Sequence, residues 1–399
     1  MSENKKTQLI TMGRKNQWTQ GVVNPPIQRA STVLFNSVLE KHKATTNRAN
    51  KTLFYGRRGT NTHFALQDAM TQLENGAGCA LFPCGAAAIA NTILSFVETG
   101  DHILMVDTCY EPTRNFCDVM LKKMGVETTY YEPTIGKDIG SLIQPNTKIL
   151  FTESPGSITM EVQDIPALSR IAHEHGIIVI MDNTWSAGLH FNALEHGVDI
   201  SIQAATKYIV GHSDTMIGTA VAKAPYWDQL REQAYLMGQC VSPDDAYSAL
   251  RGLRTLDVRM KQHQSGSLKI AQWLESQPDV DHVRHPALES CPGNDIFKRD
   301  FTGGNGLFSF VMKGSHPKAT TALLDGMKHF GMGYSWGGFE SLILANEPES
   351  FKSLRTVANP NFSGTLFRIH IGLEDPDDLI NDLEAGLNRY RNMLQQKPE

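Results

Sequence analysis

The stretch I-I-V-I-M-D-N-T-W, Ile177–Trp185, begins with a continuous apolar run and then reaches the acidic residue Asp182. A second apolar run leads into Q-A-A-T-K-Y, Gln203–Tyr208, which contains Lys207. Short runs that are apolar on both faces are typical of strands in a parallel sheet buried between helices. The sequence therefore predicts an α/β fold whose ligand site lies at the carboxyl ends of the strands.

The alternation of strand and helix extends from about residue 60 to residue 255. The predicted strands are Cys79–Pro83, His102–Asp107, Thr147–Thr152, Ile177–Asp182, Ile200–Ala204 and Met216–Ala222. Helices are predicted between most of them, including His63–Leu73, Ala86–Val97 and Pro166–His175. This pattern favours one large α/β domain with a mostly parallel central sheet.

The remainder of the chain shows a different pattern, with alternating strands at Gly306–Met312 and Leu366–Ile371. In the second of these strands, the two-residue period places Arg368 and His370 together on the face opposite the apolar one. A C-terminal helix is predicted to begin after Asp375 as its N-cap. These elements predict a smaller α+β domain.

We therefore expect three parts: an N-terminal arm over residues 1–60, an α/β domain over 61–255 and an α+β domain over 256–399.

Charge is unevenly distributed along the 399 residues, although the formal net charge is only −5. Residues 1–60 carry eleven basic and two acidic side chains, whereas the rest of the chain is acidic. A basic arm is compatible with nucleic-acid binding, but the acidic remainder and the lack of a recognised nucleic-acid module argue against it. An apolar fraction of 41% and a charged fraction of 20% exclude general disorder and a simple coiled coil.

Targeting and metal signals are weak. The first residues contain early charges without the apolar core of a signal peptide, and no credible membrane span follows. The six cysteines form no C-x-x-C pair, so we expect reduced thiols in a cytoplasmic protein. His173 and His175 lack the spacing of a metal motif and are expected at a solvated helix end.

Three features at strand ends could carry chemistry, and each has a structural alternative. The motif F-P-C-G-A-A-A, Phe82–Ala88, could bind a phosphate at a helix N-terminus, or could simply be a tight strand–helix turn. Asp182 could pair with a cation, or could cap its own turn. Lys207 could be an amine nucleophile in a dry cleft, or could extend to solvent. Together the phosphate seat, the carboxylate and the amine match the needs of pyridoxal phosphate.

The sequence resembles the Cys/Met-metabolism pyridoxal-phosphate enzymes, which have the aspartate-aminotransferase type of fold (fold type I). The resemblance covers almost the whole chain, and its motifs are Tyr55–Arg57, Cys84–Ala88, Tyr110–Pro112, Met181–Thr184, Ala205–Tyr208 and Arg251–Leu256. The segments Y-S-W-G-G-F-E-S-L, Tyr334–Leu342, and E-S-P-G-S-I-T-M-E-V, Glu153–Val162, are most similar to the bacterial β-lyases of this family.

The resemblance implies cofactor-binding roles. Lys207 would hold pyridoxal 5'-phosphate as a Schiff base and later move the substrate Cα proton, and Asp182 would pair with the pyridinium nitrogen. Tyr110 would stack on the ring, and could also deprotonate the incoming amine. The phosphate would be bound by the residues Gly85, Ala86 and Thr206 of one chain and Tyr55 and Arg57 of a neighbour. Ala204 stands where many relatives have a serine, so the resemblance implies one phosphate hydrogen bond fewer in this chain.

The resemblance also implies substrate-binding roles. Arg368 would bind the α-carboxylate in a bidentate manner, assisted by Ser335. Trp336 would help to set specificity, although it could equally be a packing aromatic. Tyr235 is similar to another site tyrosine, but helix packing explains it almost as well.

The reaction implied is β-elimination of L-cystathionine to homocysteine, pyruvate and ammonia in methionine biosynthesis, with cystine and other cysteine S-conjugates as further substrates. A γ-elimination or γ-replacement enzyme on the same scaffold is the main alternative, and a pyridoxal-phosphate-binding regulator without turnover is a weaker one. The family assembly implies a homotetramer with active sites shared between two subunits, in which the basic arm would lie on an acidic neighbour.

Overall fold

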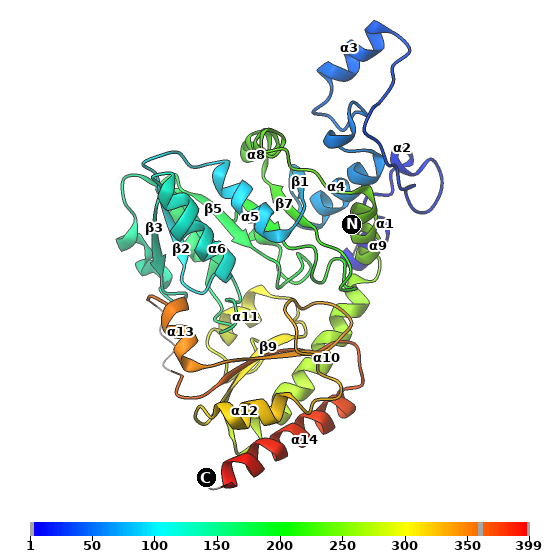
Figure 1. The fold of residues 1–399 in the computed structure, drawn as a ribbon. Helices are drawn as coiled ribbons and strands as arrows, with labels where there is room; N and C mark the ends of the chain where they lie inside the picture. The colour runs from blue at the N-terminus through cyan, green and yellow to red at the C-terminus, as the bar shows by residue number, and fades with distance from the viewer. Residues whose placement is uncertain (1–3, 358–361, 397–399) are drawn as a thin grey trace. The chain divides into compact units, whose positions relative to one another are not determined.

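The computed structural model describes residues 4–357 and 362–396, which form two compact units (Figure 1). The first unit contains the chain up to Thr99 together with Ile178–Asp257, and the second contains Gly100–Ile177 and the chain from Val258 onward. The strands form a seven-stranded sheet in the order β1-β7-β6-β5-β4-β2-β3 and a four-stranded sheet in the order β10-β11-β9-β8. The fold class expected from the sequence is therefore confirmed.

The first unit contributes four buried strands to the larger sheet. They are β1 (Gly78–Phe82), β5 (Ile178–Asp182), β6 (Ile200–Gln203) and β7 (Gly218–Ala222). Strands β5 and β6 are parallel neighbours, with Asp182 opposite Ile202, whereas β7 runs antiparallel to both β6 and β1. The parallel pairing puts the ends of β5 and β6 at one edge of the sheet, as the spacing of Asp182 and Lys207 predicts.

The first unit also contains α-helices, of which some pack on these strands and others belong to the N-terminal segment. They are α1 (Lys5–Thr11), α2 (Asn16–Thr19), α3 (Val38–Thr46), α4 (Asn61–Glu74), α5 (Gly85–Leu94), α8 (Ala224–Leu236) and α9 (Pro243–Leu253). The indole of Trp18 donates a hydrogen bond to Asp68 of α4 at 2.8 Å, and Arg254 donates to the carbonyl of Leu9 at 2.7 Å. The first two helices are thus fixed by buried or partly buried polar contacts.

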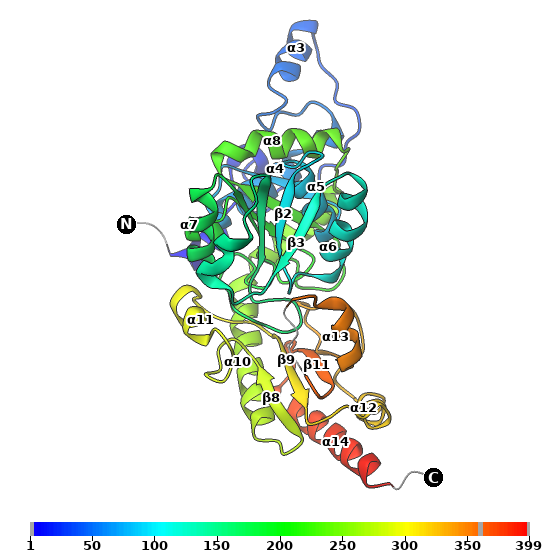
Figure 2. The same ribbon diagram turned by 90° about the vertical axis from the view of Figure 1, so that its left-hand side faces the viewer.

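Helix α3 differs from its neighbours because it stands away from the sheet of its own unit in both views (Figures 1 and 2). Its apolar side chains are exposed, with Val38 at 86% and Leu39 at 62%, and the preceding Leu34 is 89% exposed. Exposed apolar side chains are therefore gathered in this one segment.

The second unit contains three parallel strands and a separate small antiparallel sheet. The parallel strands are β2 (His102–Val106), β3 (Glu127–Tyr131) and β4 (Thr147–Glu153), and the antiparallel strands are β8 (Val280–Arg284), β9 (Leu307–Met312), β10 (Leu342–Asn346) and β11 (Leu366–His370). Its helices are α6 (Glu111–Asn115), the π-helix η2 (Phe116–Leu121), α7 (Ile165–Glu174), α10 (Leu256–Glu275), α11 (Asn294–Asp300), α12 (Pro317–Leu324), α13 (Pro348–Leu354) and α14 (Pro376–Gln395). Strands β3, β8 and β10 were not among the predicted strands.

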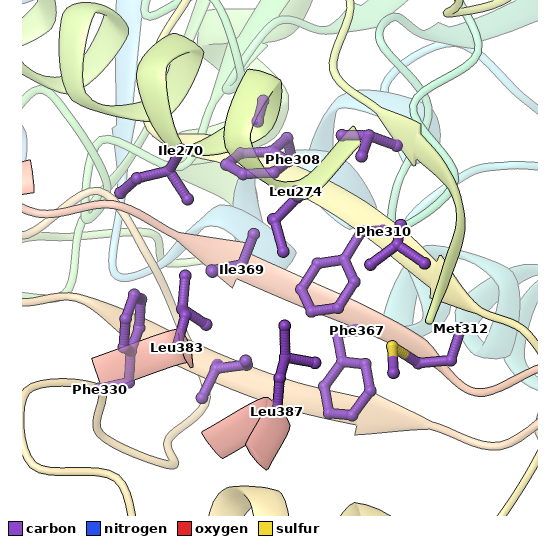
Figure 3. Close-up of a cluster of buried hydrophobic side chains, with 14 of the residues drawn as sticks. Ile270, Leu274, Phe308, Phe310, Met312, Phe330, Phe367, Ile369, Leu383 and Leu387 are labelled. Carbon is purple, nitrogen blue, oxygen red and sulfur yellow. The ribbon is translucent and has the colours of Figure 1, made fainter. Parts of the chain in front are cut away.

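The small sheet is held by an apolar core on one face (Figure 3). Phe310 of β9 and Phe367 of β11 are register partners, and their rings stack with centroids 5.0 Å apart. Leu383 and Leu387 of α14 pack into the same cluster. Helix α14 begins as predicted, with the Asp375 side chain accepting from the backbone N–H of Asp377 at 2.8 Å. The apolar face of β11 is therefore packed against β9 and α14 in this core.

Candidate active site

Asp182 lies at the end of β5 in the first unit, and its side chain is buried. Its Oδ1 accepts hydrogen bonds from the Thr184 backbone N–H at 3.0 Å and from the Thr184 hydroxyl at 2.5 Å. Asp182 therefore does cap its own turn, as the structural alternative supposed. Burial raises the pKa of Asp182, and the hydrogen bonds from Thr184 and the positive charge of Lys207 oppose that rise. A carboxyl group in this setting gains from a cationic partner.

The Thr184 hydroxyl also connects the ends of β5 and β6, because it accepts the backbone N–H of Ala204 at 2.9 Å. Lys207 follows on a turn in which its own N–H donates to the Ala204 carbonyl at 3.0 Å, and the lysine is partly buried. The neighbouring Thr206 hydroxyl accepts from the Ile217 N–H at 2.9 Å and donates to the Ile217 carbonyl at 3.2 Å. The turn that carries Lys207 is thus held by hydrogen bonds to the backbone of Ala204 and of Ile217.

The N-terminus of α5 lies against this same turn. A Cβ atom added to Gly85 would lie 2.6 Å from the Cβ of Ala204, so only glycine allows this approach. The Cys84 sulfur caps the helix by accepting the Ala87 N–H at 3.4 Å. The N–H groups of Gly85 and Ala86 precede the first intrahelical bond, which Ala88 makes to Cys84. The first turn can therefore receive an anion close to the lysine turn.

A second group of predicted residues in the first unit gathers around Tyr235 of α8. Arg57 donates to the Tyr235 carbonyl at 2.8 Å, and the Arg58 guanidinium lies 4.1 Å from the centre of the Tyr235 ring. Burial raises the pKa of Tyr235, which the charge of Arg58 opposes. Tyr55 precedes them and is 44% exposed. The structure thus brings Arg57 and Tyr235 together and adds Arg58, which the sequence analysis did not select.

Tyr110 belongs to the second unit and is the N-cap residue of α6. Its backbone N–H donates to the Glu153 carboxylate, at the end of β4, at 2.7 Å. Tyr110 is 46% exposed. The end of β4 therefore fixes the Tyr110 backbone, while the residue remains exposed.

Arg368 lies on the polar face of β11, as predicted, and is partly buried. Its Nη2 donates to the Ser335 backbone carbonyl at 3.2 Å. Burial lowers the pKa of Arg368, and nearby Tyr110 and Tyr334 oppose this change. An arginine remains charged under any such shift, so this is a fixed cation near Tyr110. Trp336 follows Ser335 and is partly buried.

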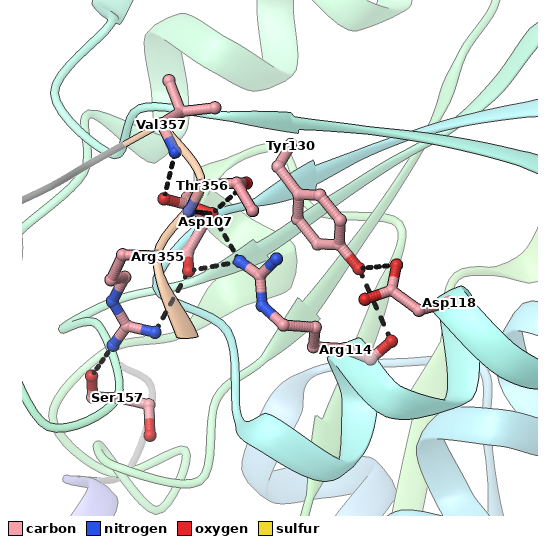
Figure 4. Close-up of polar contacts among 8 residues, drawn as sticks. All are labelled: Asp107, Arg114, Asp118, Tyr130, Ser157, Arg355, Thr356 and Val357. Carbon is pink, nitrogen blue, oxygen red and sulfur yellow. Dashed lines mark hydrogen bonds and ion pairs between the residues drawn. The ribbon is translucent and has the colours of Figure 1, made fainter. Parts of the chain in front are cut away.

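A buried polar cluster supports the Tyr110 turn (Figure 4). Asp107, three residues before Tyr110, forms an ion pair with Arg114 in which both side chains are buried. The same carboxylate accepts the backbone N–H groups of Thr356 at 3.1 Å and Val357 at 2.9 Å. Arg355 donates to the Asp107 carbonyl at 3.2 Å. The turn is therefore tied to the segment that follows α13.

Several contact residues lay outside the sequence-based selection. They are Arg58, Cys84, Asp107, Glu153 and Thr184. Thr184 stood inside the quoted motif M-D-N-T, and Asp107 directly follows an apolar strand, so both signals were present. Glu153 opened the quoted segment Glu153–Val162, but only the folded contacts indicate the roles of Glu153 and Arg58.

The described residues also bear on the expectations for metal ligands, thiols and membrane spans. No group of three or more His, Cys, Asp or Glu side chains that could hold a metal occurs in the described ranges. His173 and His175 are exposed around the end of α7, as expected. Four of the six free cysteines are buried, whereas Cys84 is partly buried and Cys240 is exposed. Among residues 4–357 and 362–396, no helix is long and apolar enough to cross a membrane.

The comparisons with known proteins agree on one family. The sequence profile described as "Cys/Met metabolism PLP-dependent enzyme" matches residues 6–388. Cystathionine beta-lyase of Haemophilus influenzae is 57% identical over 96% of this chain and 98% of its own length, and that of Escherichia coli is 58% identical over the same shares. Human cystathionine gamma-lyase is 34% identical over 96% of this chain and 93% of its own length.

Fold and site together define a pyridoxal-phosphate-dependent enzyme of fold type I. The profile match covers nearly the whole chain, so this chain belongs to the Cys/Met metabolism PLP-dependent enzyme family. Its cofactor is pyridoxal 5'-phosphate, and the residues present fit that group. A buried carboxylate stands at the end of β5, a partly buried lysine follows β6, and a glycine leaves room at the N-terminus of α5.

Proposed function

We propose that this chain is a cystathionine β-lyase, which cleaves the Cβ–S bond of L-cystathionine and releases homocysteine, pyruvate and ammonia. The observation that carries the proposal is the 57–58% identity to two bacterial proteins of that name over 96% of the chain. Identity to the human cystathionine gamma-lyase is much lower, at 34%. The physiological role that follows is a step in methionine biosynthesis in the cytoplasm, where the six free thiols would stay reduced.

Pyridoxal phosphate supplies an electron sink for the charge left when the Cα proton departs. Lys207 is the residue proposed to bind it covalently and then to take the Cα proton on its freed Nζ. Asp182 is proposed to pair with the ring nitrogen, since its buried carboxylate gains from a cationic partner. The N–H groups of Gly85 and Ala86 and the Thr206 hydroxyl are proposed to hold the phosphate.

A further set of residues is proposed to orient the substrate. Arg368 is proposed to bind the α-carboxylate through two parallel hydrogen bonds, because its Nη2 contact to Ser335 holds the guanidinium while other N–H groups remain for a ligand. Tyr110 is proposed to stack on the cofactor ring and to take a proton from the substrate amine. Fixing the carboxylate fixes the direction of the Cα–H bond, which is the main contribution of positioning to the rate. Trp336 is proposed to shape the pocket for the sulfur-bearing arm.

The reaction balances with water as the second reactant. The Cα proton goes to Lys207, the sulfur leaves with the C–S electron pair and becomes the homocysteine thiol on protonation, and the three-carbon remainder takes up water to give pyruvate and ammonia. Cystine and other cysteine S-conjugates carry the same Cβ–S bond, so we include a wider cysteine-S-conjugate β-lyase activity in the proposal.

Assembly is proposed as a homotetramer whose active sites are shared between two subunits. The exposed apolar side chains around α3 and the exposed Tyr55 support this, because they need a covering surface. Arg57 and Tyr235, joined by a hydrogen bond, would then enter the neighbour's site together. Sedimentation of the purified protein tests the assembly, and an active monomer at dilute concentration would contradict it.

Product analysis tests the reaction itself. Purified protein with pyridoxal phosphate should convert cystathionine to pyruvate and homocysteine, whereas 2-oxobutyrate and cysteine would favour γ-elimination. Absence of all turnover would favour a binding regulator. Borohydride reduction should attach pyridoxal to the peptide that contains Lys207, and Lys207→Ala should remove both the label and turnover.

A further inference from the structure

His370 shares the polar face of β11 with Arg368, yet the proposed reaction gives it no part. Its neighbours across the sheet are Leu342 of β10 and Leu307 of β9. The side chain is 1% exposed, so this face of the strand is covered rather than open to water at His370. A buried histidine needs partners for both ring nitrogens, and those partners show what the residue does.

Both nitrogens of His370 bind the backbone of one loop. The Gly337 N–H donates to Nε2 at 3.1 Å, and Nδ1 lies 3.1 Å from the carbonyl oxygen of Glu340. A backbone N–H can only donate and a carbonyl can only accept, so Nε2 is the acceptor and Nδ1 carries the proton. The two contacts are therefore satisfied together by the neutral imidazole alone.

This loop, which we name the 335–341 loop, carries two of the proposed substrate-binding residues, Ser335 and Trp336. It begins in a demanding conformation, since Ser335 has φ +83°, in the left-handed region that non-glycine residues rarely adopt. Such conformations persist where surrounding contacts hold them. Arg368 holds the Ser335 carbonyl, and the Leu373 N–H holds the carbonyl of Phe339 at 2.8 Å.

We propose that His370 is a positioning residue for substrate binding, which fixes the 335–341 loop through Gly337 and Glu340. Ser335 thereby keeps its carbonyl on the Arg368 guanidinium, and the backbone of the adjacent Trp336 is held with it. The inference rests on the substrate roles proposed above for Arg368, Ser335 and Trp336. It adds a residue that would act on KM through the loop without touching substrate.

Two substitutions separate the contacts, because each amide reproduces one ring nitrogen. In His370→Asn, the side-chain amide takes the place of Nδ1 and keeps the Glu340 contact, but Gly337 loses its acceptor. In His370→Gln, the amide oxygen takes the place of Nε2 and keeps the Gly337 contact. Gly337 is next to Trp336, so we expect H370N to raise KM for cystathionine about tenfold with kcat changed less than about threefold. H370Q should stay within about threefold of the unsubstituted protein in both constants.

His285 supplies a matched control in the same unit. It is also 1% exposed, and its Nδ1 accepts the Ala287 N–H at 3.2 Å while its Nε2 contacts the Ser267 hydroxyl at 3.1 Å. Neither partner belongs to the 335–341 loop. His285→Asn should therefore lower the stability of the protein without raising KM for cystathionine. A similar increase in KM in both histidine variants would show that the effect of H370N comes from a general loss of stability.

A second readout reports on the loop without turnover. Acrylamide quenching of tryptophan fluorescence should increase in H370N, and the increase should disappear when Trp336→Phe is added, which leaves the other four of the five tryptophans. If cystathionine is not a substrate of the unsubstituted protein, the proposed function fails while this readout still decides the role of His370. Unchanged KM and unchanged quenching in H370N would overturn the inference, as would failure of H370N to fold when H285N folds.

Discussion

The side chains of Asp107 and Arg114 form an ion pair in which they are 0% and 5% exposed. Asp107 Oδ1 also accepts from Thr356, and Oδ2 from the Val357 N–H. Removing one partner of such a pair leaves a buried charge without compensation, which is far more costly than losing an exposed pair. The Asp107 carboxylate therefore holds Arg114 by charge, and it joins the Tyr110 turn to the segment after α13 by hydrogen bonds.

Asp107→Asn should lower the free energy of unfolding by about 3–5 kcal/mol, because the buried Arg114 loses its counter-ion. Whichever way the amide turns, its NH₂ group also meets backbone N–H donors. Urea unfolding followed by circular dichroism measures the change. The control is Arg170→Gln, which breaks a pair with Glu174 whose side chains are 66% and 57% exposed, and should cost less than about 1 kcal/mol. Equal costs in the two variants would contradict the role given to Asp107.

Thr184→Val should weaken cofactor binding about tenfold or more, because it removes the hydroxyl between Asp182 and the Ala204 N–H. Losing one such contact and leaving the Ala204 donor unpaired costs about 1–3 kcal/mol, and 1.4 kcal/mol is tenfold in a dissociation constant. Titration of the apoprotein with pyridoxal phosphate, followed by its absorbance, gives the constant. Thr184→Ser restores a hydroxyl and should bind nearly as tightly as the unsubstituted protein. If the valine variant binds pyridoxal phosphate with unchanged affinity, Thr184 does not contribute to the cofactor site.

The Thr184 bridge and the Asp107 cluster are contacts that the sequence pattern does not predict. The run Ile177–Asp182 predicts its strand because every residue in it is apolar until the last, and the 25-residue spacing to Lys207 predicts neighbouring strands. The bridge from Thr184 to Ala204 depends on the register of two strands, and a spacing alone does not give that register. The Asp107 cluster joins residues about 250 positions apart in sequence. Such contacts follow from tertiary packing and have no local signal.

Missed strands have a related explanation. Strand β3, Glu127–Tyr131, is mostly partly buried and contains two threonines, so it lacks the continuous apolar run of its neighbours. On β11 the two-residue period correctly separated Arg368 and His370 from the apolar core. It gave no indication that a loop covers His370, because that loop comes from about 30 residues earlier in the chain. The division into residues 1–60, 61–255 and 256–399 and the individual site roles remain predictions.

Stability should fall as the pH is lowered below about 6.5, with a contribution from His285. Burial lowers the pKa of His285 to about 4, whereas the unfolded chain has the ordinary value near 6.5. Between these values the unfolded chain binds a proton that the folded chain does not, so the free energy of unfolding decreases with falling pH. Across this pH range, the free energy of unfolding should decrease by about 3 kcal/mol through His285.

Urea unfolding between pH 7.5 and pH 4 checks this, with His285→Asn as the comparison. The variant is less stable at pH 7.5 but lacks the titrating group, so its stability should fall less steeply than that of the unsubstituted protein. His263, whose pKa burial also lowers to about 4, remains in both proteins and cancels in the difference. Parallel pH profiles for the two proteins would show that His285 is not buried in its neutral form.

Cofactor binding should protect Cys84 from alkylation. Cys84 caps α5 directly before the Gly85 and Ala86 N–H groups, so a phosphate at those groups would cover its partly buried sulfur. Burial raises the pKa of the Cys79, Cys109, Cys117 and Cys291 thiols, and these groups should react slowly in either form. Iodoacetamide labelling mapped by mass spectrometry should therefore modify Cys84 in the apoprotein and much less in the holoprotein. The exposed Cys240 is the internal reference, and its labelling should not depend on the cofactor.

If both cysteines are protected to the same degree, the cofactor acts through assembly of subunits rather than by covering Cys84. If Cys84 reacts equally in both forms, the phosphate does not bind at the N-terminus of α5.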